Sequence, residues 1–137
     1  MIIYHTGGDN VNWFKRLFRK NNSSEPVPPI PEWDRIVEML YDKGLDAYCD
    51  EVIGVIYSHD KSMRYVFLRD EKGIYTYQFE AIYQFDEDDW KYIYQQDNAV
   101  PASWESYFKS LGRSLFDNID DMIKEIKSQP EYKRYFA

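Results

Sequence analysis

The chain has 137 residues, of which 44% are apolar and 18% aromatic, enough for one hydrophobic core in one domain. No stretch approaches the roughly 20 apolar residues of a membrane span, and the N-terminus lacks a signal-peptide pattern. These features predict a cytoplasmic protein. The single Cys49 excludes an internal disulfide and fits a reducing compartment.

Charge is divided unevenly along the chain. Residues 1–20 carry four basic residues and one acidic residue, whereas the rest carries 13 basic and 23 acidic residues, a net charge of −10. Nucleic-acid phosphates repel such a domain, whereas basic proteins are attracted to it. The charge therefore argues against nucleic acid as a partner, and it favours either a basic protein partner or simple solubility.

The first 30 residues are expected to form an arm and a linker ahead of one folded domain, residues 31–137. The four prolines from Pro26 to Pro31 favour extended polyproline geometry. The arm combines basic and apolar side chains in the segment Trp13, Phe14, Lys15, Arg16, Leu17, Phe18, Arg19 and Lys20. As a short amphipathic helix, it would suit an anionic membrane surface or an acidic partner, or it would dock on the acidic body of its own chain.

The first helix of the domain is expected to start at Pro31, which suits the first helical position. Gly44 is expected to cap its C-terminal end in the left-handed conformation. The apolar residues between them follow helical spacing and form one stripe: Trp33, Ile36, Val37, Leu40 and Tyr41.

Three apolar, aromatic-rich runs between Glu51 and Phe85 predict an antiparallel meander, because the connections 58–62 and 70–73 are short. Gly73 supplies the positive φ that the second turn needs. The run Val52–Ile56 is apolar throughout, which predicts a central strand covered on both faces. In the third run Tyr75, Tyr77 and Phe79 alternate with Thr76, Gln78 and Glu80, which are expected to face solvent.

The remaining residues predict helices on either side of a loop. Asp86 is a good N-cap for a helix that contains Trp90. Residues 97–118 are expected to be loop-like, although they are rich in aromatic residues. Asn118 opens a final helix, and Pro130 begins a last helical turn. The predicted class is therefore α+β, with an antiparallel three- to four-stranded meander packed against two or three helices.

No catalytic or metal-binding motif is evident. Cys49 and His59 are the only possible nucleophile and base, and no local motif supports an enzyme centred on them. The carboxylates of the run Asp86–Asp89 point about 100° apart on a helix, so few of them converge on one ion, and helix-terminus stabilisation accounts for them. We therefore expect no metal, no cofactor and no enzymatic activity.

The order of features over residues 31–137 resembles that of small bacterial immunity proteins, which neutralise a cognate polymorphic toxin. The matching segments are Pro31–Trp33, Glu51–Tyr57, Arg64–Gln78, Phe85–Trp90, Pro101–Glu105 and Pro130–Phe136. The resemblance implies a non-enzymatic cytoplasmic inhibitor that blocks a toxin by stoichiometric binding. It carries over no functional residues, because such proteins share none.

The acidic body suits a partner with a basic cleft, such as a toxin that attacks nucleic acid. The candidate partner-binding residues combine carboxylates and aromatic side chains, the usual composition of an interface. They are Asp86, Glu87, Asp88, Asp89, Trp104, Glu105 and Tyr107. Two alternatives remain open: core packing for Trp104, and a membrane-surface or regulatory adaptor that uses residues 11–20.

Overall fold

The computed structural model describes residues 26–107 and 114–137. By its internal contacts the chain divides into two compact units. Of the described residues, the first unit comprises 26–41 and 83–103, and the second comprises 42–82, 104–107 and 114–137. The acidic segment at Asp86–Asp89 belongs to the first unit, and most of the sheet belongs to the second.

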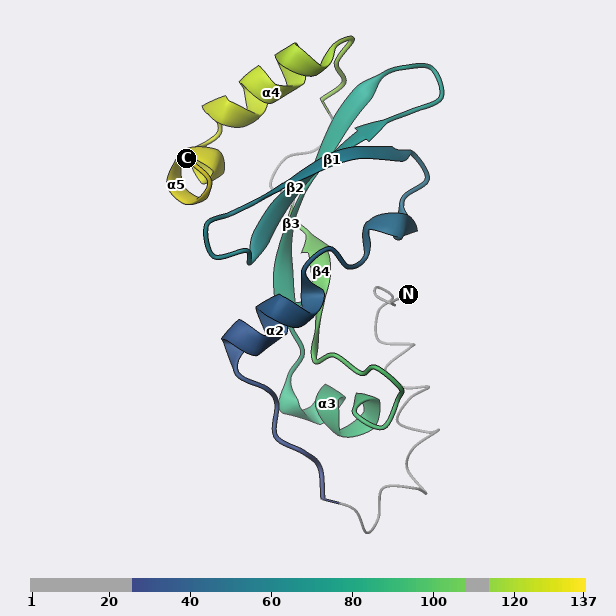
Figure 1. Cartoon of the computed structure of the whole chain (residues 1–137), viewed down its shortest axis with the longest axis vertical. Helices are drawn as coiled ribbons and strands as arrows, with labels where there is room; N and C mark the ends of the chain where they lie inside the picture. Colours follow the sequence, from purple (N-terminus) through teal and green to yellow (C-terminus); the bar gives the residue numbers. More distant parts are fainter. Residues whose placement is uncertain (1–25, 108–113) are drawn as a thin grey trace. The chain divides into compact units, whose positions relative to one another are not determined.

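The strands form a four-stranded antiparallel sheet in the order β1-β2-β3-β4, which confirms the predicted α+β class (Figure 1). The strands are β1 (Glu51–Tyr57), β2 (Met63–Arg69), β3 (Tyr75–Gln84) and β4 (Ala102–Ser106). The pairs β1–β2 and β2–β3 are joined by short turns, as the sequence predicts.

The turn between β2 and β3 shows why these hairpins form. The Asp70 carboxylate accepts hydrogen bonds from the backbone N–H groups of Lys72 and Ile74, at 2.8 and 2.9 Å. Gly73 has a φ of 82°, a conformation that costs a residue with a Cβ more than it costs glycine. This turn fixes the register in which Arg69 lies opposite Tyr75.

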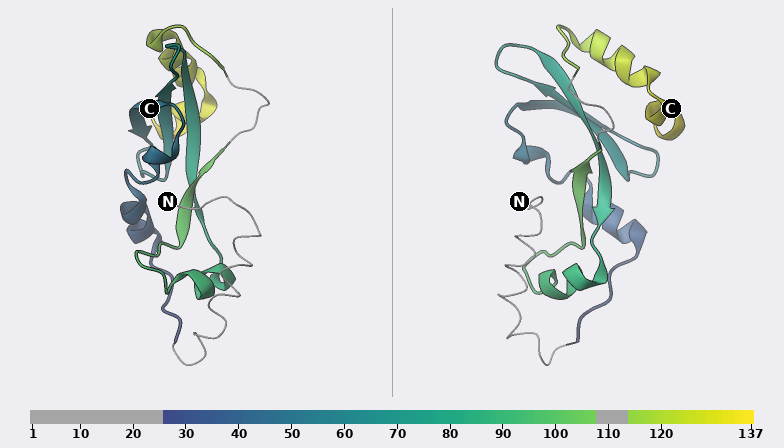
Figure 2. Two further views of the ribbon diagram at one scale, coloured as in Figure 1. Left: turned by 90° about the vertical axis from the view of Figure 1, so that its right-hand side faces the viewer. Right: turned by 180° about the vertical axis from the view of Figure 1, so that it is seen from behind.

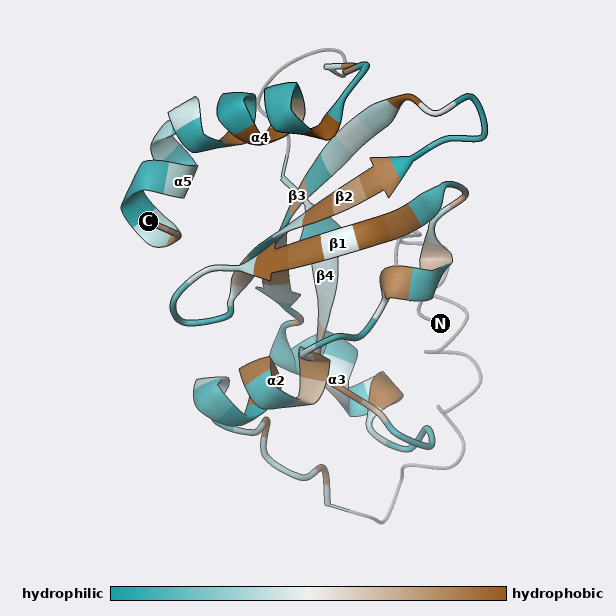
Figure 3. Cartoon of the chain, turned by 45° about the horizontal axis from the view of Figure 1, so that its top comes forward, coloured by the Kyte–Doolittle hydropathy of each residue, from teal (hydrophilic) through white to brown (hydrophobic). Residues whose placement is uncertain are grey.

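The prediction that Val52–Ile56 is a central strand is wrong, because β1 lies at the edge of the sheet. Its residues from Val52 to Tyr57 are half-buried, and its apolar run is visible in Figure 3. A continuous apolar run indicates that both faces of a strand are covered by other residues. Whether the strand is central depends instead on whether it has hydrogen-bonded neighbours on both sides in the plane of the sheet. The pairing is also interrupted by a bulge between Val52 and Gly54, a common feature of edge strands.

One face of the sheet packs against the two C-terminal helices, α4 (Ile119–Ser128) and α5 (Pro130–Tyr135) (Figures 1 and 2). Asn118 caps α4 by accepting from Asp121 N–H at 2.9 Å, and Pro130 is the first residue of α5, as predicted. The buried core on this face consists of Tyr65, Phe67, Phe79, Met122 and Ile126. Aromatic side chains stack within it, with the rings of Tyr65 and Phe79 4.7 Å apart.

The first unit contains α2 (Trp33–Leu40) and α3 (Glu87–Ile93). The indole N–H of Trp90 in α3 donates to the carbonyl of Pro28 at 2.8 Å, which ties the segment before α2 to α3. Helix α2 begins two residues later than predicted, with Glu32 rather than a residue before Pro31 as its N-cap. It also ends early, at Leu40, so Gly44 does not cap it.

Gly44 does adopt the predicted left-handed conformation, with a φ of 78°, but it precedes a 3-10 turn, η1 (Leu45–Ala47). Asp42 is left-handed as well, with a φ of 60°, which explains why the helix cannot continue to Lys43. The prediction of a loop over residues 97–118 is wrong for Ala102–Ser106, which form β4. Pro101 is tolerated before this strand, and its carbonyl accepts from Phe85 N–H at 2.8 Å.

Candidate functional site

The second face of the sheet carries a row of polar side chains across three strands. Tyr57 in β1 lies opposite Arg64 in β2, and Arg64 lies opposite Glu80 in β3. Residues that are directly opposite in an antiparallel sheet point to the same face. The prediction that Thr76 and Glu80 face solvent is wrong, because only 5% and 6% of their surfaces are exposed. The sheet is covered on this face as well, so these two residues of β3 are buried, whereas Gln78 between them is half-buried.

Arg64 is completely buried and is held by charge and hydrogen bonds. Its Nε donates to Glu80 Oε1 at 2.7 Å, and its Nη1 donates to the backbone carbonyl of Lys43 at 2.8 Å. Tyr48 O–H donates to the other carboxylate oxygen, Glu80 Oε2. Burial of a charge is costly unless it is paired and hydrogen-bonded, and Glu80 provides both for this guanidinium.

The ring of Trp104 completes this environment. The guanidinium carbon of Arg64 lies 4.0 Å from the centroid of the Trp104 ring, a cation–π contact. The Tyr57 ring meets the same Trp104 ring edge to face, with centroids 6.1 Å apart. We call Tyr57, Arg64, Glu80 and Trp104 the Arg64 cluster. All of its members belong to the second unit.

The ionisation of two tyrosines, Tyr48 and Tyr65, is expected to show whether this sheet is folded. Burial raises the pKa of Tyr48, and the hydrogen bond to Glu80 raises it further; burial also raises the pKa of Tyr65 on the opposite face. In the unfolded chain both phenols ionise near pH 10. Because the folded pKa values are higher, their contribution to stability is complete below pH 10 and falls as the pH rises above it. The absorbance change at 295 nm that is lost in Tyr48→Phe, or in Tyr65→Phe, belongs to that phenol, and it is expected to coincide with alkaline unfolding. Ionisation of either phenol near pH 10 in the folded protein would contradict this.

The predicted acidic surface lies at the start of α3. Asp86 is the N-cap, and its carboxylate accepts from Asp89 N–H at 2.8 Å, as predicted. Asp86, Glu87 and Asp88 are exposed, whereas Asp89 is half-buried. Asp88 forms an ion pair with Lys91 at 3.5 Å, with both side chains mostly exposed. Asp86 therefore has a structural role as the N-cap of α3. Glu87 and Asp88 are exposed carboxylates that do not cap this helix.

The predicted aromatic contacts are divided between core and surface. Trp104 is only 8% exposed and stacks on Arg64, so its ring belongs to the core. Glu105 is half-buried, and Tyr107 is 47% exposed. The Tyr107 ring meets Phe79 edge to face, with centroids 5.7 Å apart. Of the three residues, Tyr107 offers the most aromatic surface to a partner.

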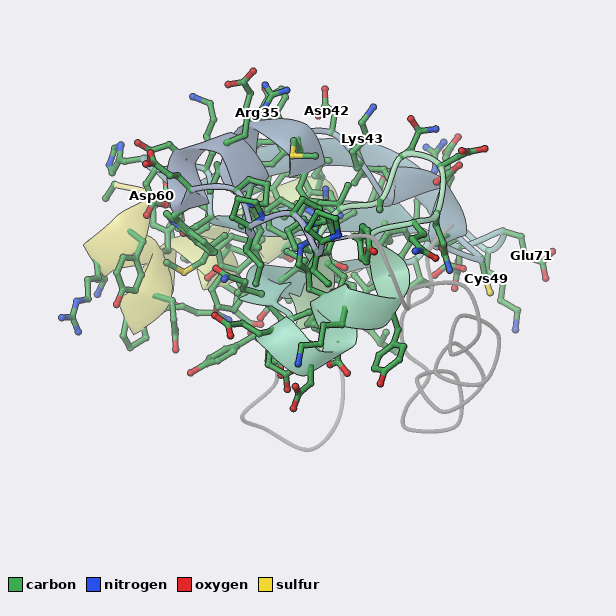
Figure 4. The ribbon with its side chains drawn as sticks, turned by 90° about the horizontal axis from the view of Figure 1, so that it is seen from below. Arg35, Asp42, Lys43, Cys49, Asp60 and Glu71 are labelled. Atoms are coloured by element: carbon green, nitrogen blue, oxygen red, sulfur yellow. The ribbon has the colours of Figure 1, made fainter. Side chains whose placement is uncertain are left out.

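Cys49 and His59 do not form a catalytic pair. Cys49 comes just before β1 and His59 just after it, so seven strand residues, about 23 Å of extended chain, separate them. Figure 4 shows Asp60, the neighbour of His59, on the opposite side of the view from Cys49. Cys49 is exposed, and the His59 ring donates from Nε2 to the backbone oxygen of Ala137 at 2.6 Å.

Other predicted sites can be placed only in part. The basic amphipathic segment 11–20 lies outside the described residues. Within residues 26–107 and 114–137, no group of three or more His, Cys, Asp or Glu side chains is arranged to hold a metal ion. No helix in those same ranges has the length and apolarity needed to cross a membrane.

Sequence reasoning missed the Arg64–Glu80 pair, although a signal for it exists. Glu80 is the single charge in the run Tyr75–Gln84, and Arg64 lies in the run Met63–Arg69, whose only other charge is Arg69 at its end. The turn centred on Lys72 places Arg64 and Glu80 eight residues on either side, so the hairpin register sets them opposite one another. Opposite charges at facing positions of predicted strands therefore indicate an ion pair.

Comparisons with known proteins give no family for this chain. It matches no protein-family model, no curated protein and no solved structure.

Proposed function

We propose that this chain is a non-enzymatic binding protein, an immunity protein that neutralises a cognate bacterial toxin by covering its active site in the cytoplasm. The observation that carries the proposal is the charge of residues 21–137, 13 basic against 23 acidic residues. The resemblance of residues 31–137 to immunity proteins supports the same function. A toxin that acts on nucleic acid has a basic cleft, to which an acidic protein is steered.

The exposed carboxylates Glu87 and Asp88 and the exposed ring of Tyr107 are the proposed contacts. The carboxylates would accelerate association, because long-range attraction acts before contact. An aromatic anchor such as Tyr107 would slow dissociation by burying apolar surface. Trp104 is omitted from the contacts because its ring is already buried against Arg64.

The test of this function is protection of cells. The chain would be co-expressed with the secreted toxin encoded beside its own gene, and growth would be measured with and without it. Protection together with a one-to-one complex of the purified proteins would support the proposal. Absence of protection by a chain that is expressed and folded would rule it out.

The contact residues have a separate test. The double substitution Glu87→Lys/Asp88→Lys is expected to slow association with the toxin at least tenfold at low salt and to flatten its salt dependence, because it reverses two steering charges. Stopped-flow mixing at several salt concentrations measures this rate. Asp86 is left intact, so the N-cap of α3 is kept.

The matched control is Glu71→Lys/Asp120→Lys. It changes the net charge of the chain by the same amount, also at exposed positions, one of them in the first turn of a helix. We expect it to alter association less than the Glu87/Asp88 pair does. Equal slowing by the two variants would mean that net charge alone steers the complex and that the start of α3 is not the contact.

A further inference from the structure

The segment Asp42–Asp50, here called the strap, is held over the Arg64 cluster by polar contacts. None of the residues of its 3-10 turn is buried, and Leu45 is half-buried. Three of its residues bond to the cluster: Asp42 exchanges hydrogen bonds with Tyr57 at 3.0 Å, Lys43 accepts from Arg64, and Tyr48 donates to Glu80. A segment with few buried apolar contacts opens at lower free energy than a core strand.

The start of the strap is also conformationally strained. Asp42 has a φ of 60° although it carries a Cβ, whereas Gly44 adopts its φ of 78° without strain. Left-handed conformations of this kind persist where the surrounding contacts hold them. Here those contacts are the hydrogen bonds to Tyr57 and Arg64, so loss of either bond favours opening at residues 42–44.

Beneath the strap, Arg64 has an unused donor. Its Nη2 is buried and has no hydrogen-bond partner among the residues that the structure describes. It points at the strap, because a Cβ at Gly44 would lie 3.5 Å from it. The neighbouring Nη1 donates to two neutral acceptors, the Lys43 carbonyl at 2.8 Å and the Tyr57 hydroxyl at 3.5 Å. Two parallel guanidinium N–H groups match the two oxygens of a carboxylate or phosphate group. The Lys43 carbonyl therefore bonds to only one nitrogen of the Nη1–Nη2 edge of the guanidinium, whereas an anion with two oxygens would bond to both.

We propose that Arg64 is the centre of an oxyanion-binding site and that the strap is its lid. In the closed form the Lys43 carbonyl takes the place of one anion oxygen. When the strap opens, the sheet stays folded, Glu80 keeps its bond to Nε, and the Nη1–Nη2 edge receives a carboxylate or phosphate group. The Trp104 ring keeps the guanidinium plane in position beneath the ligand. This site is independent of toxin neutralisation.

Two glycines provide a matched test of opening. Gly44→Ala places a Cβ at a left-handed position in the strap. Gly73→Ala does the same at a φ of 82° in the β2–β3 turn, where no atom of the described residues beyond its two chain neighbours lies within 4 Å of that Cβ. We expect Gly44→Ala to raise hydrogen exchange of strap amides and trypsin cleavage after Lys43 by roughly 5- to 30-fold. Core amides of β2 are expected to keep their protection, and Gly73→Ala is expected to leave the strap unchanged. If the strap amides exchange only when the core amides of β2 exchange as well, the strap does not open separately and is not a lid.

The anion is tested with inorganic phosphate and with acetate, each against chloride at equal ionic strength. Because only the open form binds, the apparent affinity of Gly44→Ala is expected to exceed that of Gly73→Ala by the same factor as its strap exchange. The side-chain N–H resonances of Arg64 are expected to shift on addition of the bound anion. A response to phosphate alone or to acetate alone identifies the class of ligand.

Three results would overturn the oxyanion site. The first is equal affinity in the two glycine variants, which would indicate an adventitious ion only. The second is absence of binding by phosphate and acetate in a Gly44→Ala protein whose strap exchange shows it to be open. The third is binding that leaves the Arg64 resonances unmoved, because the anion would then lie elsewhere.

Discussion

Substitution of Glu80 by alanine is expected to lower the free energy of unfolding by about 3–5 kcal/mol, because it leaves the completely buried guanidinium of Arg64 without its counter-ion. Tyr48 loses its acceptor in the same variant. Urea or guanidinium denaturation, followed by circular dichroism, measures the loss. For a chain of this size such a loss is a large part of the total stability.

Two controls separate the buried charge from other effects. Glu51→Ala removes the partner of Arg69 in an ion pair between β1 and β2, where both side chains are substantially exposed, so little change is expected. The double substitution Arg64→Met/Glu80→Leu removes both charges and is expected to recover most of the stability lost in Glu80→Ala. Equal losses in Glu80→Ala and Glu51→Ala would contradict a structural role for the buried pair.

Much of the local structure follows from the sequence because it depends on near neighbours. Asp86 and Asn118 cap their helices through bonds to the residues three positions on. Gly73 has the left-handed conformation that its turn requires. Each of these features is decided within a few residues, where side-chain chemistry and backbone sterics act directly.

Prediction from the sequence failed for features that depend on distant parts of the chain. The edge position of β1 depends on which strands lie beside it, and its own residues report only the cover on its faces. The solvent-facing position expected for Glu80 assumed that one face of the meander is open. The strap and Trp104 cover that face, and they come from segments before and after the meander.

The candidate contacts on the surface are harder to predict than the core. Hydropathy distinguishes buried from exposed segments only on average, and large aromatic residues are used both in cores and in interfaces. Trp104 and Tyr107 are three residues apart, yet one is 8% exposed and the other 47%. Trp104 packs against Arg64, which lies far away in the sequence, so its burial depends on a distant residue.

The two faces of the sheet in the second unit are stabilised by different means. The face toward α4 and α5 is an aromatic and aliphatic core, in which tolerance to substitution depends on volume. The other face depends on satisfied charge, where removal of one partner costs more than removal of both. The strap belongs to the polar face, so opening it need not disturb the apolar core, and the two faces can be perturbed separately.

Ile126→Ala is the corresponding test of the apolar face, and it is expected to lower the free energy of unfolding by about 2–5 kcal/mol. Ile126 is 1% exposed and lies in the core cluster with Tyr65 and Phe79, so truncation removes buried surface and leaves a cavity. The higher helix propensity of alanine offsets only a few tenths of a kcal/mol. Denaturant unfolding measures the loss. The ratio of hydrogen exchange in strap amides to that in core amides is expected to be lower in Ile126→Ala than in Gly44→Ala.

Ile123→Ala is the matched control, because it makes the same chemical change in the same helix at a half-buried position. The helix propensity gained is identical, so the difference between the two variants isolates the burial of Ile126 against the sheet. We expect Ile123→Ala to cost less than half as much. Equal costs would mean that α4 does not pack on the sheet through the face that contains Met122 and Ile126, and the division of the fold into an apolar and a polar face would have to be abandoned.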